Sequence, residues 1–247
     1  MNRIKRTEIK HNQSILSQRT DSDTYSELYQ ISEYYKSIQF FSEIRFGRNT
    51  PARQPQDAAL DSTFLFEDAS NLALVLNDLQ NQPEAFRKII DNLKRFYPRV
   101  ENIITRVQGG TVQIYFQEEG LTRTVPATRL SDGTLRYLCL LVILCHPTPP
   151  PLICIEEPEL GMHPDIIGVI GELLIEASER TQIIVTTHSA TLVSQIGETM
   201  PEAVVVCDYD SNGTQMQRLE KDQMELWLDE YSLGDLWTKG EIGGNRW

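Results

Sequence analysis

Two apolar runs separated by one helical stretch constrain the fold of this chain more than any other feature. The runs "LICI" (152–155) and "QIIVTT" (182–187) do not alternate polar and apolar residues. Strands of that kind are typical of a parallel sheet that is covered on both faces. A helix is predicted between them, from Pro164 to about Arg180, and parallel strands require such a crossover. The sequence therefore predicts an α/β core with a mostly parallel sheet.

The pattern continues on both sides of this unit. Before the strand–helix–strand unit, the sequence predicts a turn at 131–134 and then an apolar helix. After the unit, it predicts a helix and a further strand of the sheet, "AVVVCD". Upstream, residues 102–125 alternate around "GG" and "EEG", which predicts a three-stranded antiparallel meander. Amphipathic helices are predicted still earlier, over 22–46, 70–80 with Ser70 as the N-cap, and 83–97 with Pro83 in the first turn.

Composition excludes several classes of protein. The net charge of −12 argues against a surface that grips nucleic acid over its whole extent. The longest apolar stretch, 138–145, is too short to span a bilayer, and no signal peptide is expected at the N-terminus. No CxxC pair occurs, so zinc and disulfides are not expected. The four cysteines are interpreted as buried thiols of a reducing cytoplasm: Cys139, Cys145, Cys154 and Cys207.

The stretch "ICIEEPELGMHP" (153–164) places two carboxylates directly after a buried strand. Like charges repel, so this arrangement needs a compensating cation or full solvation. At the carboxyl end of a strand, Glu156 could enter the shell of a Mg²⁺ ion while Glu157 orients and deprotonates an attacking water. The alternative is a solvated acidic turn.

Two further motifs are weaker when each is taken alone. In "RLSDGTLRYL" (129–138), Ser131 and Gly133 stand at a helix start, where N–H groups and a hydroxyl form an anion site. An ordinary helix capped by Ser131 or Asp132 is an equal alternative. His188 follows an apolar strand and could reach a phosphate or a water there, although a structural histidine at a strand end is also typical.

In this order the three motifs resemble the C-terminal half of an ABC-type ATPase: signature motif, Walker B, D-loop and H-loop. The similarity is to RecF-like and SMC-like ATPases of the AAA_21 kind, through "LSDGTLR", "EEPELGMHP", "VTTHSATLV" and "YSLGDLWTKGEIGG", and covers roughly residues 60–247. The resemblance implies the C-terminal part of a P-loop NTPase: a helical arm or lever over 1–97, then an ATPase lobe over 98–247 that holds the meander and the parallel sheet.

The resemblance also implies a role for each motif residue. Glu156 takes the position of the Mg²⁺-associated acid, usually an aspartate, and Glu157 that of the general base. His188 matches the histidine that senses the γ-phosphate. The signature residues that close on a nucleotide held by another protomer are Ser131, Asp132 and Gly133. The D-loop residues, with Glu159 and His163 as contacts to that protomer, are Glu159, Gly161 and His163.

A P-loop is missing from the sequence, because none of the fourteen glycines is followed by lysine. The expected cofactors are ATP and Mg²⁺, and the expected partner is a second copy or a P-loop-bearing chain. The resemblance adds DNA repair or anti-phage defence, with a nuclease partner and DNA. Two alternatives stay open: a non-catalytic regulatory module of the same fold, and a Toprim-like nuclease in which Asp208 and Asp210 join the acids.

Overall fold

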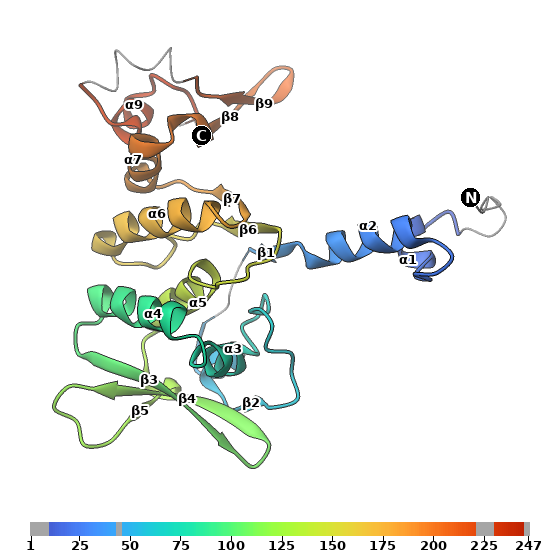
Figure 1. Cartoon of the computed structure of the whole chain (residues 1–247). Coiled ribbons are helices and arrows are strands. Elements are labelled where there is room, and N and C mark those ends of the chain that lie inside the picture. Colours follow the sequence, from blue (N-terminus) through green and yellow to red (C-terminus); the bar gives the residue numbers. More distant parts are fainter. Residues whose placement is uncertain (1–9, 43–45, 221–229, 245–247) are drawn as a thin grey trace.

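The computed structural model describes residues 10–42, 46–220 and 230–244, and a three-stranded parallel sheet lies at its centre (Figure 1). The strand order is β1 (Gln39–Phe41), β6 (Leu152–Glu156) and β7 (Gln182–Thr186). Both pairings are parallel, as the sequence predicts for β6 and β7. The α/β class with a parallel sheet and an antiparallel meander is confirmed.

Helices cover one face of this sheet. On that face Phe41, Ile153 and Ile155 are buried in a core that they share with α5 (Asp132–Leu144) and α6 (Pro164–Ser178). On the other face Phe40 is 57% and Ile184 49% exposed. The prediction of a sheet covered on both faces is therefore wrong for the described residues, although the side chains on both faces are apolar.

The second sheet is antiparallel and contains the predicted meander. Its strands are β3 (Val100–Gln108), β4 (Thr111–Glu118) and β5 (Val125–Pro126). A fourth strand, β2 (Gln56–Asp57), pairs with β4 and was not predicted. Two helices pack between this sheet and α5, and their extents agree with the predictions: α3 (Leu72–Leu79) and α4 (Pro83–Phe96).

The helix predicted for 22–46 is wrong over 38–42, and residues 43–45 of the predicted range lie outside the described residues. Helix α2 (Ser26–Ser37) follows the short α1 (Ile15–Gln18) and stops before β1. Pairing with β6 and burial of Phe41 override the helical pattern there, since tertiary contacts outweigh weak local propensity. The N-cap of α3 is Asn71 instead of Ser70, and its side chain binds backbone groups of the preceding loop.

The C-terminal part forms a small unit of its own around Leu219, Leu233 and Leu236. The sequence predicts that "AVVVCD" forms a further strand of the parallel sheet, and this prediction is wrong. The strand there, β8, pairs with the next strand, β9, in an antiparallel hairpin, and neither of them pairs with β7. The elements here are α7 (Ala190–Thr199), β8 (Val205–Asp210), β9 (Gly213–Arg218) and α9 (Leu233–Lys239). Short 3₁₀ turns connect elements of the chain: η2 (Pro51–Arg53), η3 (Ala127–Arg129) and η4 (Pro201–Ala203).

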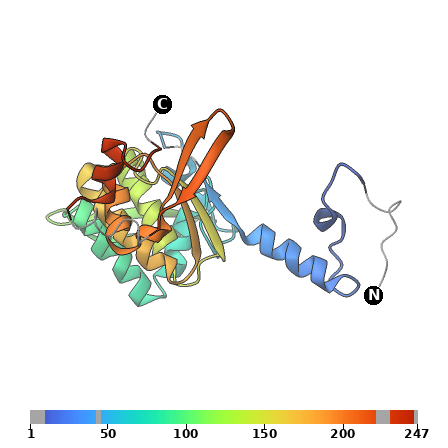
Figure 2. The ribbon, with the colours of Figure 1, turned by 90° about the horizontal axis from the view of Figure 1, so that it is seen from above.

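Helices α1 and α2 protrude from the body in both ribbon views (Figures 1 and 2). By contrast, α3 and α4 share one core with β3, β4 and α5. Residues before and after position 97 therefore share one core. The division of the chain into an arm over 1–97 and an ATPase lobe over 98–247 stays a prediction.

The cysteines are free, as predicted, but not all are buried. Cys139 and Cys145 lie in the core, Cys154 is half-buried and Cys207 is exposed on the hairpin strand β8. The burial predicted for Cys207 is wrong because its strand belongs to a two-stranded hairpin and not to the parallel sheet. Among the described helices, none is long and apolar enough to cross a membrane.

Candidate functional site

The carboxyl edge of the parallel sheet gathers the predicted acids and the predicted histidine. Glu156 ends β6 and pairs in register with Thr186, the last residue of β7. Parallel neighbours end at the same edge, so Glu157 and His188 emerge side by side. Oε1 of Glu157 lies 3.7 Å from Nε2 of His188, and the two side chains are 34% and 56% exposed. The two residues predicted to be catalytic therefore meet at a site that solvent can reach.

Glu157 adopts a left-handed backbone conformation with φ 45°. Non-glycine residues rarely adopt it, and it costs of order 1–3 kcal/mol where the surrounding structure enforces it. Here the Glu157 N–H donates to the carbonyl of Thr186 at 2.9 Å, and the Leu160 N–H donates to the Glu157 carbonyl at 2.9 Å. The backbone is thus held at both ends of the turn. A strained backbone at a charged residue of a sheet edge is a common mark of a functional position.

Glu159 ties the turn after β6 to the segment after β7. Its Oε1 accepts hydrogen bonds from the Thr187 hydroxyl at 2.5 Å and from the His188 N–H at 3.1 Å. Its Oε2 is buried and has no hydrogen-bond partner among the described residues. In this chain the carboxylate therefore positions the backbone of His188. The contact of Glu159 with another protomer that the resemblance implies stays a prediction.

The signature residues stand at the start of α5. The hydroxyl of Ser131 accepts a hydrogen bond from the Thr134 N–H at 3.0 Å and so caps the helix. Asp132 pairs with Arg53. Capping, which was the alternative interpretation, is what the side chain of Ser131 does in this structure; a role in nucleotide binding stays a prediction for Ser131, Asp132 and Gly133.

Sequence reasoning did not identify Arg53. Its guanidinium is buried and donates to the carbonyls of Ala127 and Leu130 as well as to Asp132, while its Nε has no partner among the described residues. It therefore holds the loop that leads into the signature helix. The stretch "PARQPQ" around it has only the composition of a turn, so no sequence signal marked it.

The signature motif and the D-loop touch one another. A Cβ on Gly133 would lie 3.6 Å from the carbonyl oxygen of Gly161, so the helix start and the loop are in contact. Gly161 has φ 72°, which favours glycine. His163 is exposed and caps α6 by accepting the Asp165 N–H at its Nδ1, at 3.4 Å. The turn from Glu157 to His163 thus joins the acidic edge to the signature helix.

The donor set fits one part of a Mg²⁺ site. Carboxylate oxygens are ligands that Mg²⁺ prefers, and the side chain of Glu156 is exposed at the edge. No group of three or more His, Cys, Asp or Glu side chains in the described part of the chain could hold a metal alone. Glu156 therefore fits as one ligand among phosphate and water oxygens, which is how Mg²⁺ usually binds with nucleotides.

The acids of the alternative nuclease interpretation lie elsewhere. Asp208 and Asp210 are on β8, which does not pair with β6 or β7. The Oδ1 of Asp210 accepts the Asn212 N–H at 2.6 Å, as turn-forming aspartates do. These two residues do not share the sheet edge that carries Glu156.

Comparison with known proteins identifies the family. A family described as "AAA domain, putative AbiEii toxin, Type IV TA system" (AAA_21) matches residues 2–194. The chain belongs to the AAA_21 family. The match includes the signature motif, the acidic edge and His188. The matched range, 2–194, begins and ends earlier than the range of roughly 60–247 that the resemblance predicts.

Other similarities to this AAA_21 chain are partial. The Old nuclease of Escherichia phage P2 is 40% identical over 75 residues, which are 30% of this chain and only 12% of that protein. A crystal structure of an SmcHead bound to the C-winged helix domain of ScpA has a TM-score of 0.56 and 14% identity, covering 81% of this chain and 62% of that one. An Smc head domain derived from Pyrococcus furiosus has a TM-score of 0.48 and 13% identity, with 66% and 44% covered. The fold of this AAA_21 chain is that of SMC-like ABC-type ATPases.

Proposed function

We propose that this chain supplies the catalytic edge of an ABC-type ATPase in the cytoplasm, and that a P-loop completes the site. One observation carries the proposal: Glu157 is held in a left-handed backbone conformation at the carboxyl edge, 3.7 Å from His188. The AAA_21 match and the SMC-like fold support the reaction class. ATP hydrolysis needs a positioned base and a cation beside the phosphates.

Each residue of the edge has a separate task in this proposal. Glu157 accepts the proton of the attacking water, and its fixed backbone keeps the carboxylate in place. Glu156 contributes a ligand to Mg²⁺, which when bound neutralises charge on the phosphate oxygens. His188 donates toward the terminal phosphate while Glu159 fixes its backbone.

The signature residues act on a nucleotide held by another protomer. Ser131 and Gly133 begin a helix whose N-terminus favours anions. An exposed His163 at the adjacent turn would face the same partner. ATP-dependent dimerisation, with a second copy or with a P-loop-bearing chain, follows from this arrangement. A nuclease partner, DNA and a part in DNA repair or anti-phage defence complete the proposal.

The first experiment compares isosteric substitutions in the assembly that contains a P-loop. Glu157→Gln should bind Mg-ATP normally and lower turnover by about 10²–10⁴-fold, the usual contribution of a positioned base. Glu179→Gln, at an exposed glutamate after α6, is the matched control and should leave turnover unchanged. Near-normal turnover of Glu157→Gln would refute the assignment.

The second experiment tests action across the dimer. Ser131→Arg should block ATP-dependent dimerisation, measured by light scattering, because the larger side chain occupies the anion site. Ser211→Arg adds the same charge at the exposed tip of the β8–β9 hairpin and should not interfere. Equal dimerisation of the two variants would contradict the role of Ser131.

The chain by itself should bind Mg-ATP poorly. Three carboxylates stand at the edge, and no lysine or arginine among the described residues forms an ion pair with Glu156, Glu157 or Glu159. Isothermal titration of the isolated chain checks this. Nucleotide-dependent association without any hydrolysis would favour the regulatory module.

A further inference from the structure

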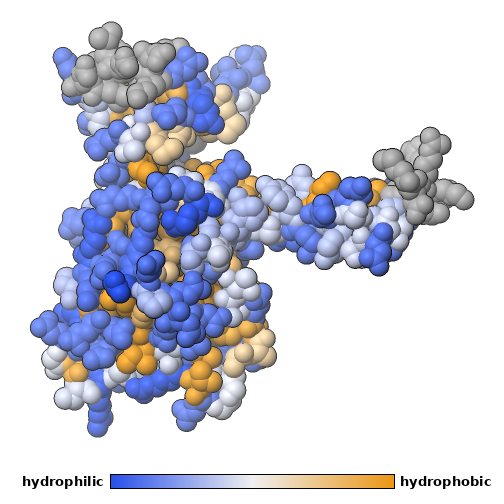
Figure 3. All heavy atoms as spheres, viewed as in Figure 1, coloured by the Kyte–Doolittle hydropathy of each residue, from blue (hydrophilic) through white to orange (hydrophobic). Residues whose placement is uncertain are grey.

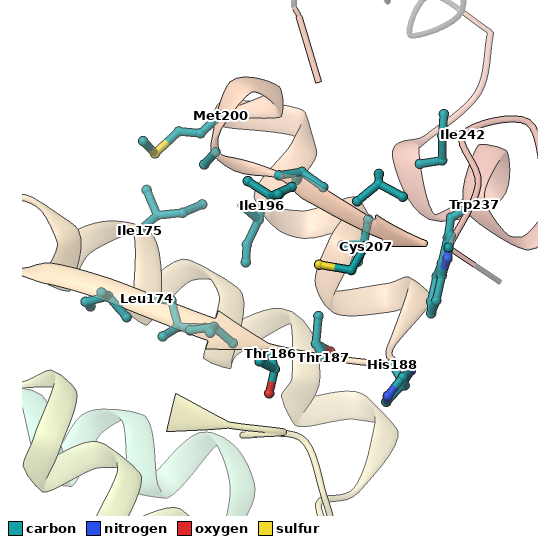
Figure 4. Close-up of a pocket in the computed structure, with 18 of the residues that line it drawn as sticks. Leu174, Ile175, Thr186, Thr187, His188, Ile196, Met200, Cys207, Trp237 and Ile242 are labelled. Atoms are coloured by element: carbon teal, nitrogen blue, oxygen red, sulfur yellow. The ribbon is translucent and has the colours of Figure 1, made fainter. Parts of the chain in front are cut away.

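The segment that follows β7 lies beside a cavity (Figure 4). The cavity has a volume of about 430 Å³ and is lined mostly by apolar side chains of β7, β8, α6 and α7, and also by Thr187 and His188, which follow β7. In Figure 3 apolar atoms are exposed where the C-terminal part of the chain meets the central layer. A void offers the atoms that line it no packing partners on that side. Packing alone therefore does not fix the position of His188.

Hydrogen bonds fix this segment instead, and Thr187 stands at their centre. Its hydroxyl donates to Oε1 of Glu159 at 2.5 Å and accepts the Ser189 N–H at 3.0 Å. The same Oε1 accepts the His188 N–H at 3.1 Å. These three hydrogen bonds form a clamp that ties the backbone before and after His188 to one carboxylate oxygen.

The clamp joins the segment after β7 to the turn that carries Glu157. Glu159 belongs to that turn, and the Glu157 N–H donates to the Thr186 carbonyl at 2.9 Å. A backbone bond therefore fixes the last residue of β7, and the clamp fixes the residues that follow it. The distance of 3.7 Å between Oε1 of Glu157 and Nε2 of His188 depends on both connections.

The second oxygen of Glu159 indicates that this arrangement does not serve Glu159 itself. Its Oε2 is buried and has no hydrogen-bond partner among the described residues. A buried acceptor without a partner destabilises a fold, so each such group in a native structure calls for an explanation. Here the carboxylate keeps the orientation that satisfies the segment after β7, and the Thr187 hydroxyl holds it in that orientation.

We propose that Thr187 is a positioning residue for the pair Glu157 and His188. Its hydroxyl orients the carboxylate of Glu159, and the two side chains together hold His188 at its place beside Glu157. Thr187 acts through these neighbours and not on the reacting atoms. This inference rests on the proposed function, because the task of Thr187 has a purpose only where that pair acts on a nucleotide.

A purely structural task is the alternative, and the chain offers a matched case for it. Thr181 directly precedes β7, and its hydroxyl donates to the carbonyl of Pro150 at the opposite end of the strand. Both threonine hydroxyls thus make a partly buried hydrogen bond at an end of β7. Replacing either one with valine should cost a similar amount of stability, but only Thr187 stands at the acidic edge.

Amide hydrogen exchange, followed by NMR on the full chain, tests the clamp without nucleotide. Thr187→Val keeps the shape of the side chain and removes the hydroxyl, so the amides of His188 and Ser189 should exchange about tenfold faster. Thr187→Ser keeps the hydroxyl and should leave both rates unchanged. The Glu157 amide, which donates to the Thr186 carbonyl, should stay protected in each variant and shows that β6 and β7 still pair.

Turnover in the assembly that contains a P-loop tests the positioning role. Thr187→Val should lower kcat by about 10–100-fold, because a small displacement of a catalytic group has an effect of this size. The KM for Mg-ATP should change by less than about twofold, since Thr187 does not bind the nucleotide. Thr187→Ser should restore kcat, and Thr181→Val, the control, should leave it unchanged.

Each other outcome overturns the proposal or the function on which it rests. Unchanged exchange of the His188 and Ser189 amides in Thr187→Val would exclude the clamp. Faster exchange with normal turnover, in an assembly whose turnover Glu157→Gln lowers, would exclude the positioning role, and so would an equal loss of kcat in Thr181→Val. Turnover that does not depend on Glu157 would refute the proposed function, and the exchange rates would still decide whether the clamp exists.

Discussion

The left-handed backbone of Glu157 predicts that replacing this residue with glycine stabilises the fold. For an L-residue the left-handed region costs roughly 1–2 kcal/mol, because the Cβ approaches the following carbonyl. Glycine removes this cost but loses about 0.5–1 kcal/mol more backbone entropy on folding. The difference between these two terms is roughly 0–1.5 kcal/mol, so Glu157→Gly should raise the free energy of unfolding over Glu157→Gln by about 0.8 kcal/mol at the centre of that range.

Comparison of these two variants isolates the backbone. Both remove the negative charge beside Glu156, so relief of repulsion cancels between them. For a chain of this size, the expected difference is a Tm about 1–4 °C higher for the glycine variant, measured by calorimetry or circular dichroism.

A reciprocal substitution in the same turn supplies the control. Gly161→Ala places a Cβ at φ 72°, and that atom would meet the Arg136 Nε at 3.7 Å, an ordinary contact. It should cost roughly 1–2 kcal/mol through the backbone alone. A glycine variant of Glu157 that is no more stable than the glutamine variant, with Gly161→Ala destabilised as expected, would refute strain at Glu157.

Three further predictions concern other parts of the chain. Burial lowers the pKa of His146, so the unfolded chain binds a proton near pH 6.5 that the folded chain does not. The free energy of unfolding should then fall between pH 7.5 and 5.5, and less so in His146→Asn, as urea titrations will show. In Gly234→Ala the new Cβ would lie 2.1 Å from the carbonyl oxygen of Ala190. Helix α9 should therefore separate from α7, at a cost of about 1–3 kcal/mol in the free energy of unfolding. Limited proteolysis should detect this separation, and Gly168→Ala, the control, should behave like the unchanged chain. The exposed Cys207 should react quickly with a thiol reagent. Cys139 and Cys145 should react only when the chain unfolds, because they are buried and burial raises the pKa of each thiol to about 12.

The acidic edge could be predicted from the sequence because its cause is local. An apolar run that ends in Glu156 and Glu157 and a second one that ends before His188 indicate two parallel strands with a crossover. Adjacent parallel strands bring their carboxyl ends together. Register then places Glu157 against His188 without help from any distant part of the chain.

The β1 strand could not be predicted, because its partner is distant. Residues 39–41 continue a helical pattern, and only the pairing of Gln39 with Ile153 and the burial of Phe41 make them a strand. The hairpin of β8 is a different case, because its partner β9 follows it directly in the sequence. The apolar residues of β8 indicate a strand but not which neighbour it pairs with.

Tertiary structure also decided the features that distinguish the site from a generic acidic turn. Which side chain a buried guanidinium such as Arg53 will meet depends on a loop that lies far along the chain. The positive φ of Glu157 arises because hydrogen bonds from two segments fix its turn. Local sequence therefore determined β6, β7, the crossover helix between them and the order of the motifs, because hydrophobic periodicity acts within a few residues. The pairing of β1 with β6 and the strained backbone of Glu157 were decided only by the three-dimensional fold, since each depends on contacts between residues that are far apart in the sequence.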